Sequence, residues 1–370
     1  MPVSLGFVND VGETPAELLT SAFFPSKVGG RPAWLAQPGP SRVECPSCHD
    51  VLSFAFQVYA PGDGADAFHR TLFFFVCTKE SCLQKAVGGG VRVLRSQLAR
   101  ANDFYSAEPP DYDGVADASA PEDAEKAASA RVTTEGDTPC PWLECEMVIE
   151  EEEPVETDNG GDASTRDRAL SDESEDGEED GDGDGDADAP VADITDDDVG
   201  EVDDEKVQAM LDEYRERVAK DGPAVTNQME LKDLEEAMAD AQGDRRDVHF
   251  AEFTRATRSD PDQVVRYGRT VDGWRPIWVT DKGRLQLSED DASAAGTVVR
   301  HEVPPCPRCG EARKVEMQVL PQMLHFMRPA AGASGLDDVD WATIVLFSCP
   351  ADCDVDGAYV DEWVFIQPMT

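Results

Sequence analysis

The 370-residue sequence has no apolar run long enough to cross a bilayer, which takes about 20 consecutive apolar residues in a helix. Its first 25 residues also lack the basic flank and the apolar core of a secretory signal. We therefore expect no membrane partner and a cytoplasmic protein, with shuttling to the nucleus as an extension of that expectation. Cysteines stay reduced in that compartment, so clustered cysteines there indicate metal ligation more than disulfides.

Positive charge is scarce. The chain has 32 Lys and Arg against 77 Asp and Glu, which gives a formal net charge of -45 at pH 7. A nucleic-acid backbone would be repelled by this charge, because binding to it depends on neutralising phosphates with Lys and Arg. We therefore expect no direct nucleic-acid binding. The charge is consistent with a basic protein partner or with none, and the chain is expected to be a monomer.

Common catalytic motifs are missing. The sequence has no phosphate-binding Gly loop followed by Lys and Ser or Thr, no nucleophile elbow and no His-Glu-x-x-His pair. The glycines at 88–90 precede a strand-like run and not a helix, so they predict a turn. The expectation is a protein that is not an enzyme, with an enzyme whose site is unrecognised as the remaining alternative.

Two stretches of the chain share the same order of features. Each has a Cys-x-x-Cys turn, then an apolar run with a Gln-Val pair, and then a second cysteine pair after another apolar run. A Pro-x-Trp-aliphatic signature precedes each stretch, at 32–35 and at 276–279. The repeated order predicts an internal duplication into two β-rich modules of one design.

Eight of the ten cysteines belong to these two sets. The first set is Cys45, Cys48, Cys77 and Cys82, and the second is Cys306, Cys309, Cys349 and Cys353. Four thiolates in a closed shell suit a structural zinc ion, and a Cys-x-x-Cys turn supplies two of them from one knuckle. We therefore predict two structural Zn²⁺ ions, which leave no open coordination position for Lewis-acid chemistry.

Other interpretations of these residues stay open. The eight cysteines can instead be buried free thiols or redox pairs, and His49 and His69 are alternative metal ligands without a counterpart in the second set. Cys140 and Cys145 have no further cysteines to complete a quartet. They are expected to be free thiols.

Apolar periodicity places the regular elements. Alternation over residues 51–59 predicts a half-buried strand, and the apolar runs at 68–77, 91–94, 274–279 and 363–366 predict further strands. Phe250 and Phe253, three residues apart, indicate a short helix, and Pro261 begins a turn through Val264, Val265 and Tyr267.

The middle of the chain differs in composition. Residues 107–205 are rich in Pro, Gly, Ser and carboxylates, so they cannot bury enough apolar surface to offset their chain entropy and are expected to be a disordered linker. This linker is either a solvated spacer or a polyanion that shields a basic client. Aliphatic residues at helical spacing over 206–242 predict amphipathic helices, with a docking face or a nuclear export signal.

The predicted fold class is α+β, mostly β. Its domains are a first zinc module over 1–106, the acidic linker over 107–205, the helical segment over 206–242 and a second zinc module over 243–370. The two modules are expected to form a composite cleft that grips a client by exposed strand edges or apolar strips.

Long segments of the chain resemble the programmed cell death protein 2 family. In the first half these are 5–7, 25–35, 68–82 and 90–106, and in the second half 260–267, 276–278, the second cysteine set and 341–353. The founding branch carries a separate Cys- and His-rich finger after the segment matched by 102–106, where this chain has only Cys140 and Cys145. The chain is thus more similar to the finger-less "programmed cell death protein 2-like" branch and to the yeast factor named for 20S rRNA accumulation.

The resemblance implies a dedicated chaperone. Its client would be a basic small-subunit ribosomal protein of the universal S5 family, captured as early as during its synthesis and escorted toward 40S assembly. The alternative from another class is a zinc-dependent protein-interaction adaptor in signalling or transcription.

Overall fold

In the computed structural model, Met1–Pro154 and Gln242–Thr370 belong to the same structural unit. The predicted helical segment 206–242 and most of the predicted linker lie outside the residues that the structure describes. Within those residues, no helix is long and apolar enough to cross a membrane. The described residues are 3–36, 38–62, 64–106, 108–110, 112, 134–135, 138–152, 247–287, 298–355 and 357–369.

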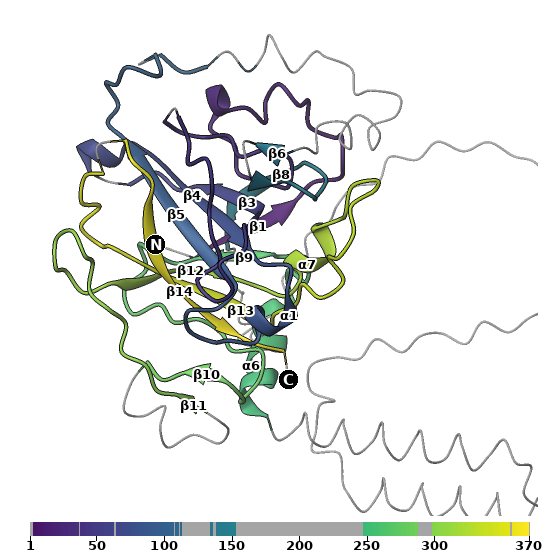
Figure 1. Ribbon diagram of the computed structural model, residues 1–370. Coiled ribbons are helices and arrows are strands. Elements are labelled where there is room, and N and C mark those ends of the chain that lie inside the picture. Colours follow the sequence, from purple (N-terminus) through teal and green to yellow (C-terminus); the bar gives the residue numbers. More distant parts are fainter. Residues whose placement is uncertain are drawn as a thin grey trace, which may run out of the picture. The chain divides into compact units, whose positions relative to one another are not determined.

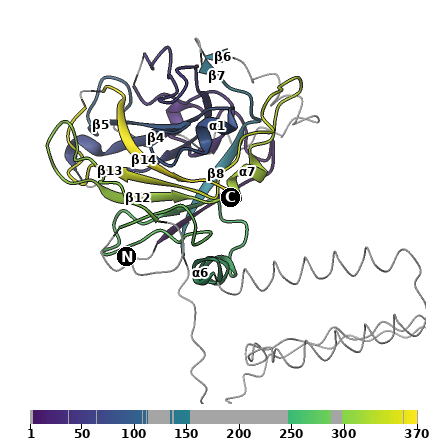
Figure 2. The same cartoon turned by 60° about the horizontal axis from the view of Figure 1, so that its bottom comes forward.

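Ten antiparallel strands close into one barrel (Figure 1). Around the barrel the order is β1, β8, β2, β3, β4, β5, β14, β13, β12, β9 and back to β1. Figure 2 shows β12, β13 and β14 side by side, with β5 next to β14. The strands are β1 (Ser4–Val8), β2 (Lys27–Val28), β3 (Ser53–Tyr59), β4 (His69–Val76), β5 (Val91–Leu98), β8 (Cys145–Glu151), β9 (Val265–Tyr267), β12 (Lys314–Val319), β13 (Thr343–Ser348) and β14 (Val360–Gln367).

The predicted architecture of two duplicated modules is wrong. The residues assigned to the two modules share a single barrel, because β5 pairs with β14, with Leu94 opposite Asp361, and β1 pairs with β9, with Gly6 opposite Val265. The predicted disordered linker is also wrong where it includes β8, which joins β1 to β2. Backbone pairing across the halves satisfies strand edges that separate modules would have left open.

The other described elements are short. The α-helices are α1 (Glu80–Leu83), α6 (Val248–Thr257) and α7 (Met323–Phe326), the 3₁₀ turns are η1 (Ser21–Phe23) and η2 (Ala65–Ala67), and the two-stranded sheets are β6 (Thr134–Glu135) with β7 (Thr138–Pro139) and β10 (Arg284–Leu285) with β11 (Val298–Val299). The predicted helix at Phe250 and Phe253 is confirmed as α6. It begins after Asp247, whose side chain accepts hydrogen bonds of 3.0 Å from the backbone N–H groups of His249 and Phe250.

Alternate side chains along the strands pack inside the barrel and against its outer surface. In β4, Leu72 and Phe74 point into the interior cluster with Trp341 from the other half, while Phe73 and Phe75 face an outer cluster with Trp34. In β13 the alternate residues likewise divide between the interior cluster and a third cluster on the outside. Burial on both faces explains why these strands are apolar throughout, where a half-exposed strand alternates.

The repeated Gln-Val pairs have a structural role. The side-chain oxygen of Gln57 in β3 accepts a 2.8 Å hydrogen bond from the Ala33 N–H, and that of Gln318 in β12 accepts one of 2.9 Å from the Ile277 N–H. Both donors directly follow the proline of a Pro-x-Trp signature. Each glutamine therefore fixes the loop that carries its tryptophan against the barrel.

The strand predicted over 274–279 is absent, because glutamine side chains bond to the backbone of this segment. The segment is coil that ends in a bend, and its N–H groups at Ile277 and Val279 bond to the side-chain oxygens of Gln318 and Gln367 at 2.9 and 3.2 Å. Side-chain amides take the place of a neighbouring strand here. The turn predicted over 264–267 is likewise wrong, because β9 completes the barrel there.

Gly29 provides a test of how closely β2 approaches the loop before β8. Its φ is +65°, and a Cβ added to it would lie 2.0 Å from the carbonyl oxygen of Leu143. Gly88 has a similar φ of +62° with nothing within 4 Å. We expect Gly29→Ala to cost at least about 3 kcal/mol of unfolding free energy, because backbone strain and overpacking add, and Gly88→Ala about 1–2 kcal/mol from strain alone. Equal shifts of the urea midpoint in the two variants would contradict this close approach.

Candidate metal centres

Two knuckles present the first cysteine pair of each set in the same way. In the first, the backbone N–H of His49 donates to the Cys45 carbonyl at 3.0 Å, and in the second that of Gly310 donates to the Cys306 carbonyl at 2.9 Å. His49 and Gly310 both have left-handed backbones, with φ of +63° and +79°. This reversal turns both cysteines of a knuckle toward one point.

The barrel strands deliver the second pair of each set. Cys77 follows β4 directly and Cys82 lies in α1, while Cys349 follows β13 directly and Cys353 lies in the loop before β14. In each quartet all the sulfur atoms lie within 4.8 Å of one another. The quartets are Cys45, Cys48, Cys77 and Cys82, and Cys306, Cys309, Cys349 and Cys353.

The sulfur separations fit a tetrahedral metal site. They are 3.8 Å for Cys48 and Cys77, 3.6 Å for Cys306 and Cys353, and 3.4 Å for Cys309 and Cys349. Four sulfurs at about 2.3 Å from a zinc ion are about 3.8 Å apart, whereas a disulfide needs about 2.05 Å. The eight thiols are free and can hold two metal ions; that the metal is zinc stays a prediction.

Of the alternative ligands, His49 lies in the first knuckle but is not among its clustered metal-binding groups, and the others lie elsewhere. His69 stacks on Phe24 at 4.1 Å and bonds through Nδ1 to the Tyr59 hydroxyl at 3.0 Å. Cys140 and Cys145 are buried thiols outside both quartets, and neither is in a disulfide. Within the described residues, the thiol groups alone form clusters suited to a metal.

The thiols of the second quartet differ in acidity. Burial opposes ionisation of Cys306, but backbone hydrogen bonds from Cys309 and Arg308 outweigh it and lower the pKa of Cys306 to about 7. Burial raises the pKa of Cys353 to about 12, assisted by its hydrogen bond with Cys306. A cation that binds all four sulfurs must displace the remaining protons, so its affinity is expected to rise with pH.

Residues from the first half of the chain contact the loop that carries the second quartet. Its loop from Cys349 to Cys353 receives an Nε2–H hydrogen bond from Gln97 to the Asp352 carbonyl at 2.9 Å, and the Arg95 guanidinium lies 3.8 Å from the Cys353 sulfur. Arg70 reaches the Asp352 carboxylate at 3.1 Å. The loop thus lies over the ends of β4 and β5 and bridges the two halves.

Beneath this loop the barrel interior is ionic. Arg70 has the same orientation as Leu72 and Phe74 by alternation, and its guanidinium makes a bidentate pair with Glu316 at 2.5 and 2.8 Å. Both side chains are completely buried, and the Tyr267 hydroxyl donates to Glu316 at 3.1 Å. Burial opposes ionisation of Glu316, but the charge of Arg70 prevails and lowers its pKa to about 2.

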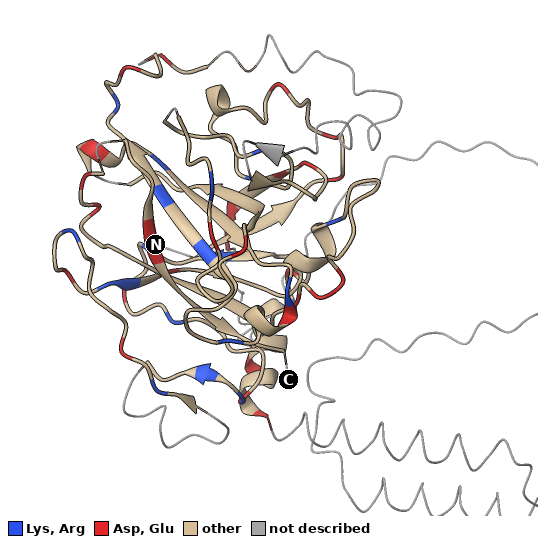
Figure 3. Cartoon of the chain, in the orientation of Figure 1, with Lys and Arg blue, Asp and Glu red and all other residues tan. Residues whose placement is uncertain are grey.

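A second buried ionic cluster lies where β5 pairs with β14. Arg95 on β5 contacts Glu362 on β14 at 2.7 Å, and Arg313 reaches the other oxygen of Glu362 at 3.1 Å. Figure 3 shows basic residues on β5 beside acidic residues on β14. These buried charges were not predicted from the sequence. For Arg95 and Glu362 a signal exists, because each is in step with the inward apolar residues of its strand.

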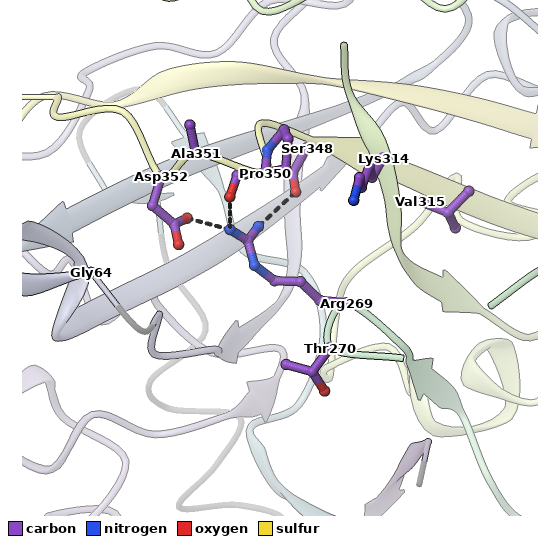
Figure 4. Close-up of a pocket in the computed structure, with 9 residues that line it drawn as sticks. All are labelled: Gly64, Arg269, Thr270, Lys314, Val315, Ser348, Pro350, Ala351 and Asp352. Atoms are coloured by element: carbon purple, nitrogen blue, oxygen red, sulfur yellow. Dashed lines mark hydrogen bonds and ion pairs between the residues drawn. The ribbon is translucent and has the colours of Figure 1, made fainter. Parts of the chain in front are cut away.

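A cavity of about 430 Å³ lies against the same loop (Figure 4). Arg269 points across it and bonds to the Ser348 hydroxyl at 2.9 Å, the Pro350 carbonyl at 3.4 Å and the Asp352 carboxylate at 2.7 Å. Lys314, also in its wall, has no ion pair within the described residues. The Arg269 guanidinium is fully engaged with protein partners, and these contacts hold the loop of the second quartet in place.

Comparisons with known proteins confirm the family that the sequence resembles. They do not support the expected placement nearer the programmed cell death protein 2-like branch, because the relatives of that name are 22–25% identical and those named programmed cell death protein 2 are 30–33% identical. Residues 2–112 match the N-terminal domain of programmed cell death protein 2, and residues 247–368 match its C-terminal domain. No solved structure matches.

Named relatives cover between about a third of the chain and all of it. Programmed cell death protein 2 of Rattus norvegicus is 33% identical over 100% of this chain and 97% of its own length, and programmed cell death protein 2-like of Homo sapiens is 24% identical over 90% and 86%. The probable 20S rRNA accumulation protein 4 of Schizosaccharomyces pombe is 27% identical over 32% of this chain and 28% of its own. The chain therefore belongs to the programmed cell death protein 2 family.

Proposed function

We propose that this protein is a non-catalytic ribosome biogenesis factor that binds a basic small-subunit ribosomal protein of the universal S5 family. It takes up this client as early as during synthesis and escorts it from the cytoplasm toward 40S assembly. Family membership supports the proposal, together with the similarity to a Schizosaccharomyces pombe protein whose name refers to 20S rRNA accumulation.

The observation that carries the proposal beyond the family is the charge. A chain with a net charge of -45 attracts a strongly basic client and repels the rRNA that the same client later binds. The carboxylates of residues 171–198 raise the capture rate by electrostatic steering.

The closed barrel restricts how the client is held. Each barrel strand has a neighbour on both sides, so an added client strand has no open barrel edge to pair with. The client is therefore bound by side chains on the outer surface of the barrel and not by adding a strand to the barrel. Two structural zinc ions, one in each thiol quartet, hold that surface rigid.

Affinity purification of the tagged full-length protein from its source cells, followed by mass spectrometry, tests the client. We expect one small-subunit ribosomal protein of the S5 family in near-equimolar amount. Raising the salt from about 0.1 M to about 1 M should weaken its retention at least about tenfold, since the Debye length falls from about 10 Å to about 3 Å. A set of regulatory proteins with no dominant ribosomal protein would instead support the adaptor and refute the proposal.

A charge variant separates steering from specific contact. Replacing the carboxylates of 171–198 by their amides should lower the association rate at low salt by about tenfold or more and leave the dissociation rate within about twofold. Scrambling the order of residues 171–198 keeps the charge and is the matched control. If the scrambled chain binds as slowly as the neutral one, electrostatic steering is not the role of this segment.

A further inference from the structure

Two exposed aromatic rings on the first half of the chain are joined by packed rings. Phe68 is 40% and Phe104 46% exposed. Phe68 lies 4.9 Å from His69, which stacks on Phe24, and Phe24 packs on Tyr105 at 4.7 Å, next to Phe104. We refer to these five residues as the aromatic patch.

The base of the aromatic patch is rigid. The Tyr105 hydroxyl donates to the Leu35 carbonyl at 2.6 Å, and His69 is tied to Tyr59. Burial, with a smaller effect of the nearby Arg100, lowers the pKa of His69, so the ring is neutral at pH 7. Phe68 and Phe104 are thus held at the surface on a fixed, uncharged support, as partner-binding aromatic residues are.

The protein itself shows which group such a ring accepts. The Arg100 guanidinium lies over the Phe68 ring, 5.1 Å from its centroid. A guanidinium stacks on an aromatic face through cation–π attraction and its own planarity, which a lysine ammonium lacks. One ring of the aromatic patch is therefore already in contact with an arginine.

Carboxylates surround the aromatic patch in the sequence. Asp66 in η2 lies two residues before Phe68, Asp103 adjoins Phe104, and Glu108 follows shortly after. All three are exposed, and none has an ion pair within the part of the chain that the structure describes. Exposed rings next to unpaired carboxylates complement a chain segment that carries arginines.

We propose that the aromatic patch is a docking surface for an arginine-containing segment of the basic partner, whose guanidinium groups stack on Phe68 and Phe104 while Asp66 and Asp103 pair with them. This inference rests on the proposed function for the identity of the partner. It adds the recognised chemistry, which is arginine in preference to lysine. Arg100 holds one stacking position until a partner arginine replaces it.

The test compares two synthetic peptides on the full-length protein. One peptide alternates Arg and Gly, and the other has Lys in place of every Arg, so both carry the same charge and meet the same acidic linker. Fluorescence anisotropy should show a wild-type preference for the Arg peptide of about tenfold, from two cation–π contacts. The double variant Phe68→Ala/Phe104→Ala should bind both peptides equally.

Matched variants complete the experiment. Phe250→Ala removes a ring of similar exposure, 37%, from α6 and should keep the preference for the Arg peptide. Arg100→Gln frees the face of Phe68 and should increase affinity for the Arg peptide. Exposed substitutions of this kind leave stability nearly unchanged, which thermal unfolding verifies. No Arg preference in the wild type, or a preference that survives Phe68→Ala/Phe104→Ala, would overturn the inference.

The inference and the proposed function fail separately. If the affinity purification yields the ribosomal protein equally with the wild type and with Phe68→Ala/Phe104→Ala, the function stands and the docking surface is refuted. If the Arg preference depends on the two rings but no ribosomal protein is recovered, the docking chemistry stands and the client is wrong.

Discussion

Replacing Cys309 by serine is expected to destabilise the barrel strongly although its side chain is exposed. Its sulfur is one of four in the second quartet, 3.4 Å from that of Cys349. Binding of a structural zinc ion contributes about 10–16 kcal/mol to small zinc domains, as much as the whole stability of a typical protein. Losing one ligand should therefore remove much of the stability, measured as a large fall in the urea midpoint, and a chelator should unfold the wild type.

Cys145→Ser is the matched control for this substitution. Cys145 is buried in β8 outside both quartets, so its loss costs only the burial of a hydroxyl, about 1–3 kcal/mol. If the quartets were merely packed thiols, the order would reverse, because exposed Cys309 would tolerate serine better than buried Cys145 does. The comparison therefore separates a metal ligand from a core residue.

Removing the Glu316 carboxylate is expected to have the second large effect. Glu316→Ala leaves buried Arg70 with only the Asp352 carboxylate, at 3.1 Å, and removes the 3.2 Å contact of Arg269 with Glu316. Removing one partner of a buried ion pair typically costs about 3–5 kcal/mol. Because Arg70 lies on β4 and Glu316 on β12, this loss falls on the contact between the two halves. Glu44→Ala breaks the exposed pair with Arg42 and should cost at most about 1 kcal/mol.

The same pair gives a pH dependence of defined sign. The pKa of Glu316 is lowered to about 2 in the folded protein, below its ordinary value of 4.5. Its stabilisation is therefore complete above about pH 4.5 and is lost as the pH falls toward 2. The difference in unfolding free energy between wild type and Glu316→Gln should shrink over this range. A difference that stays constant from pH 6 to about pH 2.5 would show that Glu316 is not ionised in the fold.

Local sequence patterns correctly predicted individual strands and the two cysteine knuckles. The alternation at 51–59 and the apolar run at 68–77 became β3 and β4, and Cys-x-x-Cys spacing located both knuckles. The prediction that the strand at 51–59 is half-buried was wrong, because β3 is buried on both faces. Closure of the barrel has no such local pattern in the sequence. It depends on pairs such as Leu94 with Asp361, far apart in the chain, and pairing at that distance has no sequence period.

The strand β8 was not predicted, because the composition of the acidic tract around it predicts disorder. In β8, Cys145, Met147 and Ile149 alternate with Glu146 and other residues, which is the pattern of a strand, but the segment lies at the edge of an acidic tract that as a whole predicts disorder. The buried charged residues were not predicted either. A single arginine within an apolar strand, such as Arg70, suggests a solvent-facing residue until its partner on another strand is known.

The most direct test of two thiol-bound metal centres in one barrel is the metal content of the purified protein. Elemental analysis of the wild type is predicted to find two zinc ions per chain, with the same number in Cys145→Ser and one in Cys309→Ser. Wild-type protein that is folded and contains no stoichiometric metal would contradict the account.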